Sequence, residues 1–102
     1  KYYTYERYQD ILDEILRTVI ARGRGIELNT GGFHYGLGEP NPCRAVIRLY
    51  RELGGEIIII GADAHGPEKI AYDFDKAAAI LADCGFKYYT VFQNRKPEFV
   101  KL

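Results

Sequence analysis

Glu56-Ile57-Ile58-Ile59-Ile60-Gly61-Ala62-Asp63-Ala64-His65-Gly66-Pro67 is the most informative segment of this chain. Its four consecutive isoleucines predict a strand buried on both faces, as in parallel sheets that carry helices on each side. Gly61 ends that strand, and Pro67 suits the first turn of a helix, where its missing N–H costs nothing. The segment is therefore predicted to be strand, short loop and helix. In α/β folds such loops lie at the carboxyl end of the sheet, where active sites are built.

Two good metal ligands occupy this loop. Asp63 and His65 stand two residues apart, so their side chains can point the same way. A carboxylate and an imidazole together suit Zn²⁺, Fe²⁺ or Mn²⁺. Considered alone, the pair is equally consistent with an aspartate that caps the next helix and a histidine bonded to backbone. The position directly after a buried strand favours the metal site.

The rest of the chain alternates helices and strands. Apolar residues at i, i+3, i+4 spacing predict helices, and Pro97 confines the tail to a loop or a sheet edge. Asn41-Pro42 is expected to start the second helix, and the third helix is expected to break near residues 72–73. The predicted order is helix 5–21, strand 26–30, glycine-rich loop 31–42, helix 43–53, strand 56–60, helix 67–83, strand 87–92 and tail 94–102.

Equivalent strand positions recur at a regular interval, because Ile26, Ile57 and Tyr88 are successively 31 residues apart. This period is typical of consecutive βα units with right-handed crossovers. An open doubly wound sheet and a β/α barrel both accept such units. Three strands alone leave both sheet edges unpaired. We therefore expect either that the chain is the C-terminal part of a larger α/β domain or that it covers those edges by self-association.

Polar side chains gather on one face of the first strand. Glu27 and Asn29 alternate there with Ile26 and Leu28. In a barrel this polar face would line the interior near the mouth, and a buried glutamate is costly unless it is paired or near a metal. An exposed edge face is the alternative.

Two further segments carry candidate anion-binding residues. The glycines of the loop after the first strand allow the backbone to approach a phosphate closely, although the loop has no P-loop or dinucleotide pattern. His34 in this loop is a candidate contact to an anionic substrate, and Arg95 beside Lys96 is a candidate phosphate ligand. The alternatives are a surface loop and a solvated tail.

Composition argues against several classes of protein. The chain has 102 residues, of which 47% are apolar, and this suffices for one domain with a core. Basic and acidic residues number 14 each, so the charge balance does not indicate binding to nucleic acid or to an anionic membrane. No stretch approaches the roughly 20 apolar residues of a membrane span. Cys43 and Cys84 are far apart and form no metal or disulfide framework, so we expect a reducing, cytoplasmic setting.

Three motifs resemble, in the right order, the C-terminal part of histidinol-phosphatases of the PHP (polymerase and histidinol phosphatase) type. They are Ile26-Glu27-Leu28-Asn29-Thr30, Gly36-Leu37-Gly38-Glu39-Pro40-Asn41-Pro42 and Gly61-Ala62-Asp63-Ala64-His65. The last is similar to the family's closing metal-binding loop. The resemblance covers nearly the whole chain. It implies that residues 1–102 are the C-terminal segment of a single PHP domain, a distorted (β/α)7 barrel with two or three divalent metal ions (Zn, Mn or Fe) at the carboxyl ends of its strands.

The resemblance also implies an activity, the hydrolysis of L-histidinol phosphate in histidine biosynthesis. Asp63 and His65 match the family's last metal ligands, and Asn29, His34 and Arg95 are candidates for binding this small-molecule phosphate ester. The family pattern has a serine and an arginine where this chain has Gly31 and His34. Because that arginine is expected near the substrate phosphate, the departure leaves the substrate open.

The chain has only two histidines and lacks the family's earlier motifs, so we expect it to hold part of a metal cluster. We assign no catalytic residue and expect the isolated 102 residues to be inactive. The alternatives are a PHP-like module with a non-catalytic or regulatory role, another PHP phosphoesterase, and a small independent α/β binding domain that dimerises through its strand edges.

Overall fold

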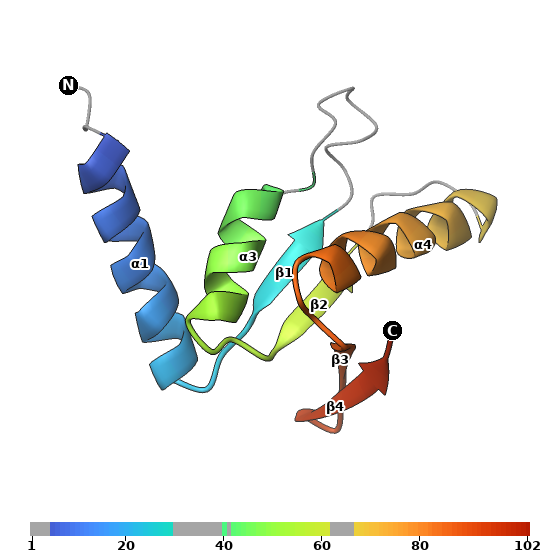
Figure 1. Ribbon diagram of the computed structural model, residues 1–102. Helices are drawn as coiled ribbons and strands as arrows, with labels where there is room; N and C mark the ends of the chain where they lie inside the picture. Colours follow the sequence, from blue (N-terminus) through green and yellow to red (C-terminus); the bar gives the residue numbers. More distant parts are fainter. Residues whose placement is uncertain (1–4, 30–39, 41, 62–66) are drawn as a thin grey trace.

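The computed structural model describes residues 5–29, 40, 42–61 and 67–102. Helices and strands alternate along this part of the chain (Figure 1). The elements are α1 (Tyr5–Ala21), β1 (Ile26–Asn29), α3 (Arg44–Glu52), β2 (Ile58–Gly61), α4 (Pro67–Asp83), β3 (Tyr88–Gln93) and β4 (Lys96–Lys101).

The first two strands form the parallel pair that the sequence predicts. β1 pairs with β2 in a register that places Ile26 opposite Ile58 and Asn29 opposite Gly61. Helix α3 lies in the connection between them, so β1, α3 and β2 form one βαβ unit. This confirms an α/β fold with parallel strands.

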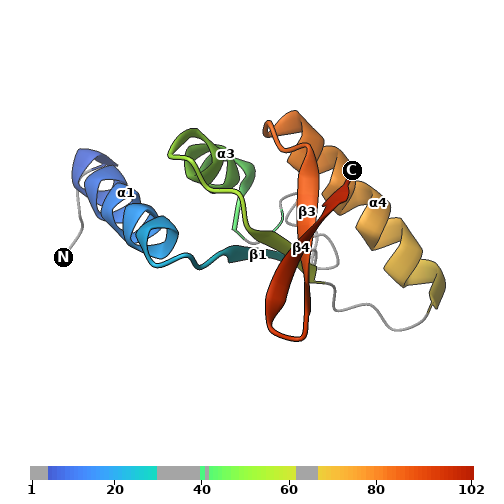
Figure 2. The same ribbon diagram turned by 90° about the horizontal axis from the view of Figure 1, so that it is seen from below.

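The three helices lie on one side of the β1–β2 sheet (Figure 2). Of the four consecutive isoleucines only Ile58 is fully buried, and Ile57, Ile59 and Ile60 are partly exposed. The prediction of a strand buried on both faces is therefore wrong for the described part of the chain, because no described helix covers the opposite face.

The core lies between the sheet and the helices. Leu28 and Ile58 point from the two strands to the covered face and are completely buried. Burying such side chains stabilises the fold by roughly 1.5–3 kcal/mol each. The buried apolar residues of this core are Leu16, Leu28, Ile47, Tyr50, Ile58, Ala77, Ile80, Leu81, Cys84 and Phe86.

Tyr50 connects the end of α3 to the start of β2. Its hydroxyl donates a hydrogen bond to the Ile57 carbonyl at 2.7 Å, and its ring stacks near Phe86 with 6.3 Å between centroids. Gly55 makes room for the ring, because a Cβ on this residue would lie 2.4 Å from the Tyr50 Cζ. Burial raises the pKa of the Tyr50 phenol above its usual 10.0; the hydrogen bond to Ile57 opposes this and the charge of Glu56 adds to it.

The third strand does not extend the parallel sheet as predicted. β3 pairs in antiparallel fashion with β4, the tail expected to be a loop or an edge, and Pro97 lies within this edge strand opposite Phe92. The two strands are joined by Asn94 and Arg95, whose φ angles of 52° and 66° give the left-handed backbone of a two-residue hairpin turn. The hairpin packs beside the sheet, because the Ile58 N–H donates a hydrogen bond to the Thr90 hydroxyl at 3.2 Å.

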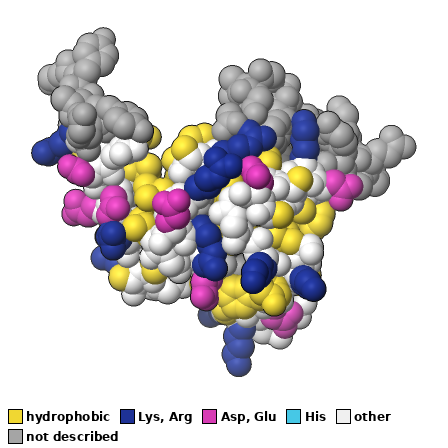
Figure 3. All heavy atoms as spheres, in the orientation of Figure 1, with side chains coloured by type: hydrophobic (Ala, Val, Ile, Leu, Met, Phe, Trp, Pro, Cys, Tyr) yellow, Lys and Arg dark blue, Asp and Glu magenta, His cyan; other side chains and the backbone are white. Residues whose placement is uncertain are grey.

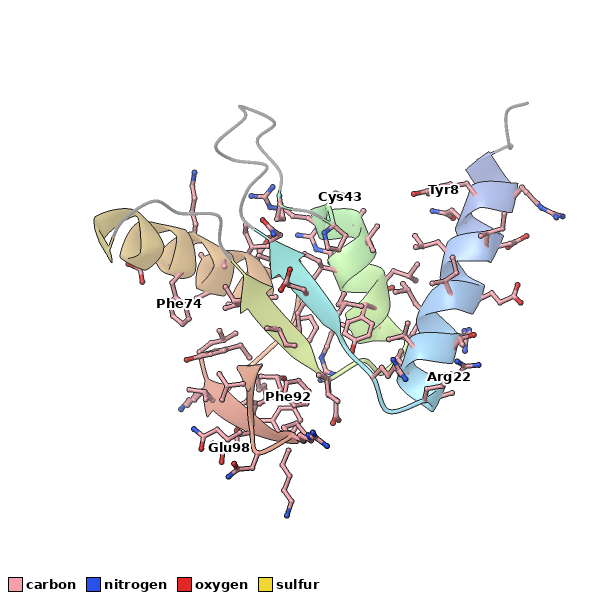
Figure 4. All side chains as sticks on the ribbon, turned by 180° about the vertical axis from the view of Figure 1, so that it is seen from behind. Tyr8, Arg22, Cys43, Phe74, Phe92 and Glu98 are labelled. Atoms are coloured by element: carbon pink, nitrogen blue, oxygen red, sulfur yellow. The ribbon has the colours of Figure 1, made fainter. Side chains whose placement is uncertain are left out.

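Helix α4 also contacts the hairpin. Figure 4 shows Phe74 pointing from α4 towards the strands of the hairpin. Its ring meets Tyr89 edge to face, with 5.2 Å between centroids and an interplanar angle of 80°. The helix is continuous from Pro67 to Asp83, so the break expected near residues 72–73 is wrong.

The remaining boundaries differ from prediction by a few residues. Helix α1 has the predicted limits, and α3 begins at Arg44 with Cys43 as its N-cap, one residue after the predicted start. Asn41, the predicted cap, lies outside the described residues. Cys43 makes no side-chain capping bond, and Cys84 is buried; neither forms a disulfide. None of the helices in the described ranges is long and apolar enough to cross a membrane.

Replacing Thr90 by valine is expected to lower the free energy of unfolding by about 1–3 kcal/mol, because the buried Ile58 N–H loses its acceptor. Thr90→Ser keeps the hydroxyl and serves as the control. Urea unfolding followed by circular dichroism measures both variants. Equal losses for valine and serine would show that the hydroxyl contributes nothing.

Tyr50 should make the fold sensitive to alkali. Below about pH 10 the phenol is protonated in both folded and unfolded chains, so its contribution is complete. As the pH rises further, the unfolded chain releases the proton first because the folded pKa is higher, and the free energy of unfolding falls. Tyr50→Phe should remove this part of the decline, while Tyr88→Phe, at an exposed position, should keep it. Urea unfolding at a series of alkaline pH values tests this, and identical pH profiles for the two variants would contradict it.

Candidate metal and phosphate site

The carboxyl ends of β1 and β2 meet at one edge of the sheet. Asn29 and Gly61 end the two strands and lie opposite each other. Asp63 follows Gly61 by two residues and His34 follows Asn29 by five. Asp63, His65 and His34 themselves lie outside the described residues, so their metal and substrate roles stay predictions. The structure does establish that both segments leave the sheet from the same edge.

Asn29 and Glu27 occupy the face of β1 that points away from the helices. Leu28 between them is completely buried against the core, and side chains alternate along a strand. Asn29 is partly buried and Glu27 is exposed. The predicted polar face is therefore present, and its last member lies at the edge from which the candidate ligand segments depart.

The Glu27 carboxylate lies against the last residue of β2. A Cβ placed on Gly61 would stand 2.8 Å from Glu27 Cδ and 2.9 Å and 3.1 Å from its two carboxylate oxygens. Sequence reasoning placed Glu27 on the polar face but missed this contact. The glycine that ends the isoleucine run indicates that another group approaches the backbone closely there. Only the pairing of β1 with β2 shows that this group is the Glu27 side chain.

Arg95 is not brought to this edge. It lies in the turn between β3 and β4. In Figure 1 the arrowheads of β1 and β2 point upward, whereas the β3–β4 hairpin lies below the sheet. Its role in phosphate binding stays a prediction that this arrangement does not favour.

Within the described ranges, no three His, Cys, Asp or Glu side chains lie close enough together to hold a metal ion. Asp63 and His65, the predicted metal ligands, lie outside these ranges, so their role stays a prediction. A carboxylate and an imidazole fit the ligand preferences of Zn²⁺, and Glu27 places a further carboxylate at the same edge.

A cleft of about 330 Å³ lies elsewhere, at the amino ends of β2 and β3. Its walls include Arg51, whose guanidinium stands 5.7 Å from the Phe86 ring centroid, and the exposed Phe99. In Figure 3 hydrophobic surface is visible over this lower part of the molecule, and charges of both signs are interspersed around it. This cleft was not predicted, and it is separate from the carboxyl edge.

No family model matches the chain. It is 30% identical over 98 residues to the probable histidinol-phosphatase of Thermotoga maritima, covering 96% of this chain and 41% of that protein. It is 31% identical over 86 residues to the probable histidinol-phosphatase of Clostridium acetobutylicum, covering 81% of this chain and 32% of that protein. The chain thus spans less than half the length of these relatives, and its resemblance to histidinol-phosphatases is confirmed over nearly all of its own length.

A solved structure shares the fold. The crystal structure of histidinol phosphate phosphatase from Lactococcus lactis, complexed with Zn, L-histidinol and phosphate, matches with a TM-score of 0.70 and 22% sequence identity. The match covers 94% of this chain and 36% of that one. The arrangement of helices and strands described above therefore matches about a third of that larger structure.

Arg95→Gly is expected to raise the free energy of unfolding by a few tenths to about 1 kcal/mol, because glycine adopts the left-handed backbone at this turn position without steric cost. The control is Lys96→Gly, in the neighbouring strand, which should destabilise the hairpin. Thermal unfolding measures both. A lower melting temperature of Arg95→Gly would contradict the expectation. A raised KM for a phosphate ester in this variant would show that Arg95 takes part in substrate binding.

Proposed function

We propose that this chain is the C-terminal segment of a metal-dependent phosphomonoester hydrolase of the histidinol-phosphatase type, with L-histidinol phosphate as the first substrate to test. The observation that carries the proposal is the match over 96% of the chain to a probable histidinol-phosphatase. The shared fold with an enzyme crystallised with zinc, L-histidinol and phosphate supports it.

The arrangement of the sheet supports a barrel. In a doubly wound sheet helices cover both faces, whereas in a β/α barrel they form an outer ring and the other face lines the interior. Here α1, α3 and α4 lie on one side (Figure 2). The opposite face carries Glu27 and Asn29 beside the partly exposed Ile59. We infer that this face points to the interior of a distorted (β/α)7 barrel whose other strands come from the rest of the domain.

The residues of this chain would have distinct tasks at the carboxyl edge. Asp63 and His65 would hold a divalent metal, as their donor chemistry fits. When bound, the metal would polarise a phosphoryl oxygen and lower the pKa of a coordinated water. Asn29, at the end of β1, would orient the substrate through its amide. His34, two residues after the paired glycines, would contact the phosphate where the family pattern has an arginine.

Asp63→Asn is expected to lower kcat/KM for histidinol phosphate by at least about 100-fold, because even the partners of metal ligands are worth about 10–100-fold. The natural protein at full length is assayed for phosphate release, with and without a chelator. Asp75→Asn, at an exposed position on α4, is the matched control.

The outcomes separate the candidate functions. Chelator-sensitive hydrolysis that Asp63→Asn abolishes and Asp75→Asn retains would support the phosphatase. Metal binding without hydrolysis of any phosphomonoester would favour the non-catalytic PHP-like module. Full activity of Asp63→Asn would refute the metal role of this residue.

A further inference from the structure

Three aromatic side chains are exposed on one face of the β3–β4 hairpin. Tyr88, Phe92 and Phe99 keep 47%, 49% and 47% of their surface accessible. Tyr88, Thr90 and Phe92 alternate along β3 and therefore point the same way. Phe99 lies opposite Thr90 and Pro97 lies opposite Phe92, and directly opposite residues of an antiparallel pair share a face. We call Tyr88, Phe92, Pro97 and Phe99 the aromatic face of the hairpin.

The aromatic face turns towards the β1–β2 sheet, whereas the other face of the hairpin contacts α4. Thr90 stands in the middle of the aromatic face, and its hydroxyl accepts the Ile58 N–H at 3.2 Å. Tyr89 points to the opposite side and meets Phe74 of α4. Because Ile58 is the first residue of β2, the hairpin is held at the amino end of the sheet.

The turn of the hairpin reaches past the sheet on the side that the described helices leave open. Figure 2 shows β3 and β4 crossing the level of β1 and β2, with their connecting turn on the side away from the helices. Phe92 lies two residues nearer this turn than Thr90, which corresponds to roughly 6–7 Å along the strand. Phe92 and its partner Pro97 therefore lie beside the open face of the sheet, at its amino end.

The cleft at the amino ends of β2 and β3 continues the aromatic face. Tyr88 and Phe99 line this cleft of about 330 Å³ together with the buried Phe86. The cleft can take up an apolar side chain from whatever packs on the hairpin. The exposed aromatic rings and the cleft thus form one apolar surface, which a water-soluble protein rarely leaves uncovered.

The free edge of β4 is protected against pairing with a further strand. Pro97 has no N–H to donate, and Lys96 and Lys101 are the two end residues of this edge strand. Prolines and lysines are the residues with which natural proteins prevent edge-to-edge association. Addition of a second copy at this edge is therefore disfavoured, and the aromatic face is left to be covered by side chains.

We propose that the aromatic face of the hairpin packs against the part of the natural protein outside these residues, and that the hairpin thereby closes the amino end of the barrel. This inference rests on the proposed function, which makes the chain a segment of a larger domain. The chain covers 41% of the Thermotoga maritima relative and 36% of the matched structure, so most of such a domain is available for this contact. Strands that meet the open face of the sheet also reach the aromatic face beside it.

Thiol labelling of the natural protein at full length tests the proposal. Phe92→Cys is introduced in a background free of other accessible thiols, which includes Cys43→Ser. Its rate of reaction with a maleimide is compared with that of Glu98→Cys, because Glu98 is exposed and shares the opposite face of the hairpin with Val91. We expect Phe92→Cys to react at least about 10-fold more slowly at every protein concentration, since a buried thiol reacts only when the structure opens locally.

Phe92→Ala provides a second measurement that needs no thiol. We expect the ratio of folded to unfolded natural protein to fall at least about 100-fold, as for truncation of a buried phenylalanine. Gln93→Ala, at an exposed position on the opposite face, is the control and should change this ratio less than about threefold. Urea unfolding measures both variants, and equally small changes would contradict the proposal.

The labelling outcomes identify what covers the aromatic face. Slow reaction of Phe92→Cys at all concentrations supports packing within one molecule. Slow reaction that becomes fast on dilution shows that a second copy covers the face, and equal rates for the two thiols show that it is exposed. Either of these results overturns the proposal.

If Phe92→Cys does not fold, oxidation of the wild type by hydroxyl radicals decides between the same outcomes. Phe92 and Phe99 should be oxidised at least about 10-fold more slowly in the native protein than in urea, and equal rates would overturn the proposal. Neither measurement depends on catalysis. A protein with a protected Phe92→Cys thiol that cleaves no phosphate ester therefore loses the proposed activity and keeps this packing.

Discussion

The pairing of β1 with β2 in a single register is the constraint on which the rest of the structure depends. It places Leu28 and Ile58 together on the face covered by the helices, and Glu27 and Asn29 on the other. A shift of one residue would turn Leu28 away from the core and bring a carboxylate into it. Burial of the apolar side chains therefore determines where the polar ones point. The same register sets Asn29 opposite Gly61, so the two candidate ligand segments begin side by side.

The β1–β2 sheet is connected to the β3–β4 hairpin by a hydrogen bond to a side chain. In a continuous sheet a backbone carbonyl would accept this bond. The Thr90 hydroxyl accepts the Ile58 N–H, and its side chain is almost completely buried. This satisfies a buried donor at the end of the parallel pair without a third parallel strand. At the same end of the strand, the Tyr50 hydroxyl donates a hydrogen bond to the neighbouring Ile57 carbonyl and so holds α3 against β2. The hydroxyl groups of Tyr50 and Thr90 thus fix the start of β2 against α3 and β3.

The helices cover only one face of the β1–β2 sheet (Figure 2), and this agrees with the similarity of the chain to part of the histidinol-phosphatases. The chain spans less than half of the Thermotoga maritima protein and matches the fold of a zinc-containing phosphatase structure over 94% of its own length. The uncovered face carries Glu27 and Ile59. Such a face is compatible with a barrel interior, where it would meet strands outside these residues.

Hydrophobic periodicity and the isoleucine run predicted the helices, the first three strands and the parallel βα unit, because these patterns depend on local spacing alone. The sequence by itself also determined Asp63 and His65 as the metal candidates, through motifs that need no coordinates. The tertiary structure decided what depends on distant partners. It turned the tail into β4, because Asn94 and Arg95 adopt the left-handed backbone of a hairpin. It also seated Glu27 on Gly61, since 34 residues of sequence separate two positions that only strand pairing brings into contact.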